Sequence, residues 1–199
     1  AVRQSMGRAT FYGFTHRGPI RLYVEMMFLC GSGFDTDPQY QPVGDILREK
    51  GDQMARAERI HRLSLDYGEK VAGPKGANVR RALEGLLEFT KGQVEFPVSN
   101  FRAAMLDNFR RLFPERVNYI GEPPLNQLID QASVEARNYR FTTPRQAALI
   151  VILKFAFGHR CTQDPLYPWI ERTLNDPKII EPAARADRLE RKAIVWLEH

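Results

Sequence analysis

Apolar residues recur at intervals of three and four positions along most of this chain, which is the spacing of helices that bury one face. After Pro19, for example, Ile20, Tyr23, Val24 and Met27 follow this spacing. Proline is tolerated in the first turn of a helix, so the pattern indicates a central helix that begins near Pro19. No segment alternates between apolar and polar residues for long enough to indicate a strand. The pattern therefore predicts an all-α fold, a helical bundle.

The stretch from Tyr12 to Leu47 occurs twice in the chain. Shifted by 127 residues without a gap, it lies over Tyr139 to Leu174. Eleven pairs are identical: Tyr12/Tyr139, Phe14/Phe141, Thr15/Thr142, Leu22/Leu149, Val24/Val151, Phe28/Phe155, Gly31/Gly158, Asp37/Asp164, Pro38/Pro165, Tyr40/Tyr167 and Leu47/Leu174. Two residues out of register, ARAERIHR (55–62) matches ARADRLER (184–191). This self-similarity predicts a tandem repeat of one helical module.

Glycine and proline divide the chain into modules. The sequence Gly-Pro-Lys-Gly at 73–76 resists helix continuation, so the first module is expected to cover residues 1–73. A connecting helix at 74–94 has no counterpart in the repeat, and the second module covers 95–199. Because Ala1 falls over Leu128, in the middle of a helix, the first module is expected to be N-terminally incomplete.

The two central helices should be equivalent. We expect the first to superpose on the second, with Gly31 and Gly158 at equivalent helix ends and with both Phe28 and Phe155 buried. Truncating either phenylalanine to alanine should then cost about 3–5 kcal/mol. The connecting helix, whose leucines have no other assigned surface, is expected to cover the first module near Tyr23 and Met27.

Composition favours protein contacts over nucleic acid. The formal charge is +5, but the 29 basic residues are interleaved with 24 acidic ones. Seven of the basic residues are lysines, which leaves 22 arginines, and arginine pairs well with carboxylates and aromatic faces. In the duplicated helix the arginines have Glu58 and Asp187 beside them, so nucleic acid is an unfavoured partner. A nucleic-acid-binding helical protein or a nuclease-type toxin remains the alternative function.

No residues with catalytic or metal-binding spacing are evident. The histidines occupy no equivalent positions in the two copies, and His159 with Cys161 provides only two of the four ligands of a structural zinc. The sequence therefore indicates no enzyme, no cofactor and no metal. Cys30 and Cys161 are not equivalent either, and we expect buried, reduced thiols in a reducing compartment. The longest apolar run, 147–157, is well short of the about 20 residues of a membrane span.

Candidate partner-binding residues come from two places. The first is the arginine face of the duplicated helix, and the second is the turn that follows the first central helix. The candidates are Arg56, Arg59 and Arg62, their counterparts Arg185 and Arg188, and the turn residues Gly33, Phe34 and Asp35.

Two stretches carry a resemblance to a known family: LYVEMMFLCGSGFDTDPQY at 22–40 and FRRLFPERVNYIG at 109–121. They resemble small, helical, mostly unannotated proteins encoded in proteobacterial type VI secretion clusters, beside spike (VgrG), PAAR-type tip, adaptor and toxin genes. The second copy departs from the family pattern, with GHRC at 158–161 where the first has GSGF at 31–34.

The resemblance implies an accessory protein of the bacterial cytoplasm that acts as a chaperone, co-adaptor or immunity protein for a secreted effector. Its partner would be an effector toxin, an adaptor or a spike or PAAR component. An architectural scaffold is a further possibility, and the family's motifs define no reactive site.

Overall fold

The computed structural model describes residues 1–91 and 97–198, and within them all regular structure is helical, which confirms the all-α prediction. Short 3-10 and π turns join the α-helices. The described α-helices are α1 (Val2–Phe11), α2 (Arg17–Cys30), α3 (Gln41–Arg48), α4 (Gln53–Tyr67), α5 (Ala77–Lys91), α6 (Phe101–Leu112), α7 (Pro114–Ile120), α8 (Glu122–Asn138), α9 (Pro144–Phe157), α10 (Pro168–Leu174) and α11 (Pro182–Leu197). The junction expected at residues 94 and 95 lies outside the described residues. In the described part of the chain, no helix is both long and apolar enough to cross a membrane.

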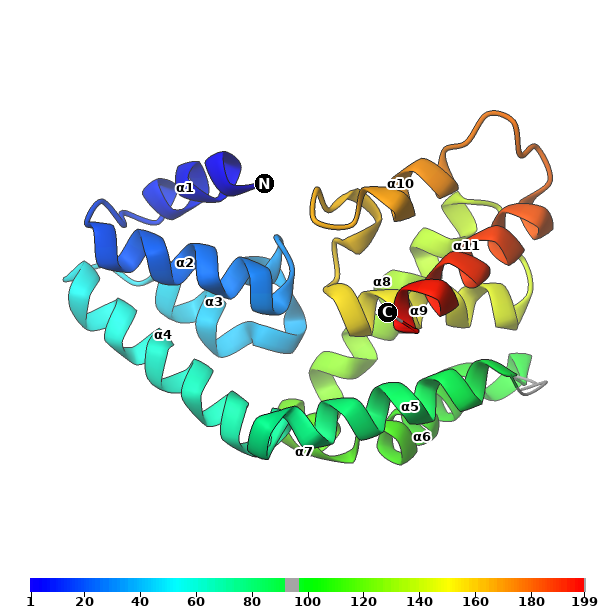
Figure 1. Cartoon of the computed structure of the whole chain (residues 1–199), viewed down its shortest axis with the longest axis horizontal. Helices are drawn as coiled ribbons and strands as arrows, with labels where there is room; N and C mark the ends of the chain where they lie inside the picture. The colour runs from blue at the N-terminus through cyan, green and yellow to red at the C-terminus, as the bar shows by residue number, and fades with distance from the viewer. Residues whose placement is uncertain (92–96, 199) are drawn as a thin grey trace.

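The helices fall into two groups joined by a third (Figure 1). Helices α1 to α4 form one half of the molecule, and α8 to α11 form the other. Helices α5, α6 and α7 run along one side and connect the halves. Each half has its own apolar core: one includes Phe14, Met27 and Ile60, and the other includes Leu128, Phe155 and Leu189.

Local signals explain the two central helices, α2 and α9. Each has 14 residues, and their starts differ by the same 127 positions as the matching sequences. Helix α9 begins with a capping box, in which Thr143 and Gln146 satisfy each other's backbone N–H groups. Both helices end at a glycine, with φ of 89° at Gly31 and 96° at Gly158, a conformation that favours glycine.

The connecting helix α5 packs against the second half, so its predicted docking on Tyr23 and Met27 is wrong. Ala82 and Leu86 of α5 belong to the core of the second half. Tyr23 and Met27 are already buried by residues of their own half: the Tyr23 ring lies 4.8 Å from that of Phe34, and the Ser5 hydroxyl of α1 contacts the Met27 sulfur. These two side chains therefore offer no surface to α5, although Leu29 of the same helix lines a hollow together with Val79 and Leu83 of α5.

The prediction that Phe28 and Phe155 are both buried is half correct. Phe155 is fully buried, whereas 55% of Phe28 is exposed. Phe155 stacks on Phe109 of α6 at 4.1 Å between ring centroids and contacts Phe113 at 5.0 Å. Among the described residues, no such ring contacts are found at Phe28.

The two glycine turns meet each other at the joint between the halves. Asp37 accepts a hydrogen bond from the backbone N–H of His159, and Asp164 accepts one from that of Ser32, both at 2.7 Å. A side chain at Gly31 would come within 2.4 Å of the Phe157 carbonyl oxygen. Each half thus supplies one aspartate that accepts a hydrogen bond from the glycine turn of the other half, and these two bonds hold the halves together.

Candidate functional site

Four of the eight candidate partner-binding residues lie in the interior. Gly33, Phe34, Asp35 and Arg56 are all buried, so they cannot form a partner surface in this fold. Asp35 accepts hydrogen bonds from the hydroxyls of Tyr12 and Tyr23 at 3.0 and 2.9 Å and pairs with Arg8. All of these contacts reach Oδ2, whereas the buried Oδ1 has no hydrogen-bond partner among the described residues, so the cost of burying the carboxylate is offset only in part.

Arg56 has a structural role of its own. Its guanidinium donates to the carbonyl oxygens of Tyr12 and Leu47, at 3.0 and 2.9 Å, and lies 5.0 Å from the centre of the Phe14 ring. It therefore ties α4 to the ends of α1 and α3. Burial of an arginine in a helix face was not foreseen, because the helical period alone placed this residue outside the apolar stripe.

The other four candidates are at least partly accessible but have intramolecular partners. Arg59 pairs with Glu49, and Arg62 pairs with Glu58 at 2.9 Å. The hollow that they line is also lined by Asp45, Glu49 and Asp66, so three carboxylates stand against the two arginines. Arg185 donates to the Ile179 carbonyl oxygen at 2.8 Å, and Arg188 lies 3.5 Å from Asp176.

A larger open surface lies along α11 and α5. We call it the basic trough, and its volume is about 990 Å³. Its lining residues are Leu83, Trp169, Arg188, Arg191, Lys192, Val195, Trp196 and Leu197. Three cations and no carboxylate line it, while Val195 is 53% exposed and Trp196 is 44% exposed. The trough therefore combines exposed apolar side chains with two cations, Arg191 and Lys192, that have no ion pair among the described residues, whereas Arg188 lies near Asp176.

The positive rim of the trough is held by neighbouring residues. Lys192 donates to the Thr173 hydroxyl at 2.9 Å, which fixes its position beside α10. Arg191 has no ion pair among the described residues. Trp196 packs edge-on against Phe157, with ring centroids 4.5 Å apart, so its ring is oriented although nearly half of it is exposed.

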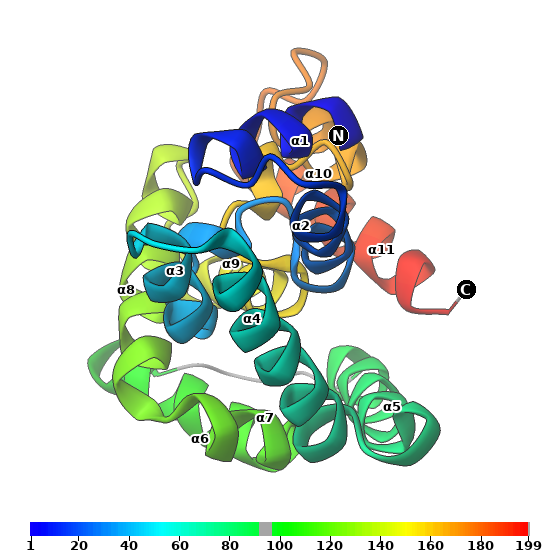
Figure 2. The ribbon, with the colours of Figure 1, turned by 90° about the vertical axis from the view of Figure 1, so that its left-hand side faces the viewer.

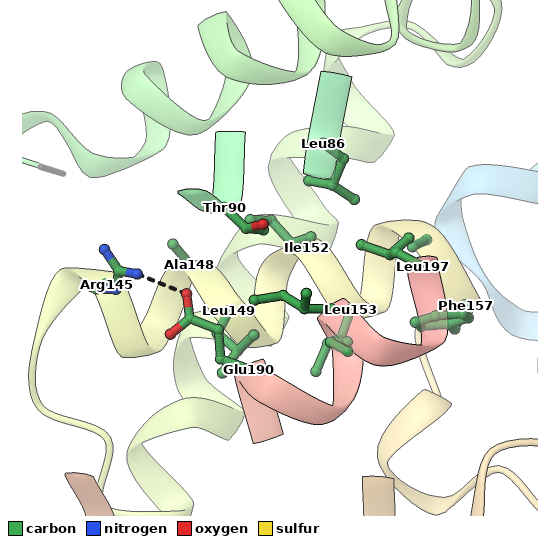
Figure 3. Close-up of a pocket in the computed structure, with 13 residues that line it drawn as sticks. Leu86, Thr90, Arg145, Ala148, Leu149, Ile152, Leu153, Phe157, Glu190 and Leu197 are labelled. Carbon is green, nitrogen blue, oxygen red and sulfur yellow. Dashed lines mark hydrogen bonds and ion pairs between the residues drawn. The ribbon is translucent and has the colours of Figure 1, made fainter. Parts of the chain in front are cut away.

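A smaller, partly open cavity lies between α5, α9 and α11 and shares Leu197 with the trough (Figure 3). Leu86 and Thr90 of α5, Ile152 and Leu153 of α9 and Leu197 of α11 point into it, and an Arg145–Glu190 ion pair of 2.7 Å lies at its edge. Its volume of about 60 Å³ is far below the roughly 300–1,000 Å³ of a small-molecule site. The cavity is a packing defect of the core rather than a ligand pocket.

A third hollow extends this surface towards the first half. Its volume is about 240 Å³, and it shares Leu83, Trp196 and Leu197 with the basic trough. Leu29, at the end of α2, and Val79 of α5 also line it, and both are exposed. The third hollow therefore adjoins the basic trough along α5.

Thr36, His159 and Asp37 lie next to one another in the order hydroxyl, imidazole, carboxylate, as in a catalytic triad, but the distances between them are too long. Thr36 Oγ1 lies 3.4 Å from His159 Nε2, and His159 Nδ1 lies 3.4 Å from Asp37 Oδ2. Both distances exceed the about 2.6–3.2 Å of a nucleophile activated by a base. None of the hollows described above is lined by these residues. The group belongs to the joint between the halves.

The cysteines are free and buried, as the sequence indicated. Burial raises the pKa of both thiols, that of Cys30 to about 12. A reactive cysteine requires the thiolate, which this environment disfavours at neutral pH. Within the described residues, no three His, Cys, Asp or Glu side chains gather in a way that could hold a metal ion.

Comparisons with protein families, curated proteins and solved structures find no match to this chain. The candidate site therefore stands on its geometry.

The sequence reasoning missed most of the basic trough. Only Arg188 was among the candidates, while Arg191, Lys192 and Trp196 were not. A signal in the sequence was available: Val195 and Trp196 lie within one helical turn of Arg191 and Lys192 in the last helix, so one helix carries both basic and apolar side chains. The exposure of Val195 and Trp196, however, depends on where α5 packs, and the sequence pattern does not determine this.

Proposed function

We propose that this chain is a non-enzymatic protein-binding protein that holds a protein partner in the basic trough. The observation that carries the proposal is the exposure of Trp196 and Val195 beside Arg188, Arg191 and Lys192, with no carboxylate in the lining. Exposed apolar surface with a polar rim is typical of protein interaction sites. Tryptophan and arginine are the residues most enriched among those that dominate binding energy.

The partner segment should match this surface in charge and shape. An aromatic or aliphatic side chain would contact Trp196 and Leu197, and flanking Asp or Glu residues would face Arg191 and Lys192. Charge complementarity of this kind increases the association rate and excludes wrong partners. The mixed charges around Arg59 and Arg62 make that surface a weaker candidate.

The resemblance to proteins of type VI secretion clusters supplies the proposed setting. The partner would be an effector toxin, an adaptor or a spike or PAAR component, met in the bacterial cytoplasm. The chain would act as its chaperone, co-adaptor or immunity protein. The tandem repeat belongs to this proposal, and the matching bounds of α2 and α9 support it.

The test is co-purification of the chain with the products of neighbouring genes. Trp196→Ala should weaken binding of the true partner by about thirtyfold or more, the effect of removing a dominant interface residue. Arg191→Ala should weaken it less. The matched control is Arg62→Ala, at the corresponding position of α4 and outside the trough.

Thermal unfolding should show that each variant folds, because Trp196 also contacts Phe157. A partner that binds wild type and both trough variants equally would contradict the proposed site. Failure of every neighbouring product to bind would contradict the proposed function.

A second candidate is single-stranded nucleic acid, favoured by the same exposed tryptophan beside cations. Such binding combines aromatic stacking with phosphate contacts and weakens steeply as salt increases. Saturable binding of an oligonucleotide that is lost in both Trp196→Ala and Arg191→Ala would favour this function instead.

A further inference from the structure

We infer that the third hollow binds a small organic acid with an apolar or aromatic body, and that Arg116 receives its carboxylate. The hollow lies where the first half meets the connecting helices. There the end of α4 and the π turn at Gly68–Ala72 lie beside α5 and α7 (Figures 1 and 2). Arg116 and Val79 line this hollow but not the basic trough, so the inference does not rest on the proposed function.

Arg116 of α7 is a partly buried cation without a direct ionic partner among the described residues. Its guanidinium lies 4.3 Å from the centre of the fully buried Phe155 ring. Nη2 donates to Gln39 Oε1 at 2.9 Å and to the Tyr40 hydroxyl at 3.2 Å. Asp37 is linked to this network only through Gln39, whose Nε2 donates to it at 3.3 Å. Because a desolvated cation is costly unless it is paired, an anion beside this guanidinium would be stabilising.

The guanidinium has donors left for such an anion. Nε has no hydrogen-bond partner and is closed off from water. Nη1 also donates to no described residue, but unlike Nε it is not closed off from water. Since Arg116 lines the hollow, Nη1 is the donor that a ligand there would meet. One carboxylate oxygen on Nη1 would supply the missing charge-assisted hydrogen bond.

The charges around the hollow leave this position to a ligand. Glu115 is the one carboxylate among the described residues that line it, and Glu115 pairs with Arg81 of α5. Arg116 is the one cation in the same lining. The hollow therefore offers one positive group whose counter-ion the described chain does not provide.

The rest of the lining suits an apolar body. Phe113, Phe157 and Trp196 supply aromatic faces, and Val79 and Leu83 of α5 supply aliphatic ones. The volume of about 240 Å³ is just below the roughly 300–1,000 Å³ of sites for drug-sized ligands. The ligand is therefore a small acid with a single ring or a short branched chain.

The experiment compares 3-phenylpropanoate with 3-phenylpropanamide, a neutral compound of the same shape, on the full chain. Binding is followed by NMR titration, in which the Nε–H signal of Arg116 reports contact in the hollow. The acid should bind about tenfold more tightly than the amide and should shift this signal, because only the acid brings a counter-charge to the guanidinium. Equal affinities, or no binding of the acid, would overturn the inference.

Variants of the chain locate the site. Arg116→Gln should remove the preference for the acid and leave the affinity for the amide nearly unchanged, which a merely structural role of Arg116 would not produce. Val79→Phe, which fills the hollow from α5, should weaken binding of both compounds at least about fivefold. The matched control is Val134→Phe on α8, because Val134 is 51% exposed, against 43% for Val79, and lines none of the hollows described above.

Thermal unfolding accompanies the titrations, because Arg116→Gln also changes the contacts with Gln39 and Tyr40. If that variant did not fold, the acid–amide comparison and Val79→Phe would still decide. A preference for the acid that persists in folded Arg116→Gln, or undiminished binding to Val79→Phe, would overturn the inference.

A further arm tests a short peptide that ends in phenylalanine with a free carboxylate. Tighter binding of this peptide than of the small acid, lost in the same variants, would assign the hollow to the chain end of a protein partner and would replace the small acid as the occupant. The proposed function is tested separately, because Arg116, Val79 and Val134 all lie outside the basic trough.

Discussion

Phe28 and Phe155 form a matched pair for measuring what tertiary contacts contribute to stability. They occupy corresponding positions in α2 and α9, yet one is largely exposed and the other is enclosed by Phe109, Phe113 and the Arg116 guanidinium, 4.3 Å from its ring centre. Burying a phenylalanine contributes about 1.5–3 kcal/mol, and stacking adds about 0.5–1.5 kcal/mol. With the cavity that remains, Phe155→Ala should cost about 3–5 kcal/mol. Phe28→Ala should cost less than about 1 kcal/mol.

Urea denaturation followed by two signals provides the assay. Circular dichroism reports all helices, whereas fluorescence reports Trp169 and Trp196, both in the second half. Phe155→Ala should shift both transitions to lower urea. If Phe28→Ala and Phe155→Ala lowered the free energy of unfolding equally, the reasoning would be refuted. Such a result would show that Phe28 is buried in solution by a contact that this structure does not contain. A loss below about 1.5 kcal/mol for Phe155→Ala would refute the stacked core.

Three further predictions concern the joint between the halves and the thiols. Gly31→Ala should cost at least about 2 kcal/mol in urea denaturation, because φ is 89° and the new carbon would lie 2.4 Å from a carbonyl oxygen. Gly7→Ala, in the open face of α1, should instead stabilise by about 0.5–1 kcal/mol. Asp37→Ala should lower the melting temperature, since the backbone N–H groups of Gln39 and His159 lose their acceptor, while an unchanged value would rule out this joint. Burial raises the pKa of Cys30 to about 12, so its contribution to stability is complete below the unfolded pKa of about 8.5 and is lost as pH rises towards 12. Denaturation between pH 8 and 11 should show this decline, and in Cys30→Ala it should be shallower.

Much of the secondary structure could be predicted because its signals are local. The helical spacing after Pro19, the Thr143–Gln146 capping box and the terminal glycines each act within one or two turns of a helix. The ion pair of Glu58 with Arg62 is equally local, since residues four apart on a helix are neighbours. Helix α7 was not among the predicted elements, although Pro114 is a favourable helix start.

Burial, in contrast, was decided by which helices approach each other. The same residue type is enclosed at Phe155 and exposed at Phe28, because α6 covers only α9. The helical period placed Arg56 on an outer face, but the ends of α1 and α3 bring carbonyl oxygens to it and make its burial favourable. The docking of α5 on the second half formed the basic trough beside Trp196. A helix's own sequence states which of its faces is apolar, but only the positions of its neighbours decide how much of that face water still reaches.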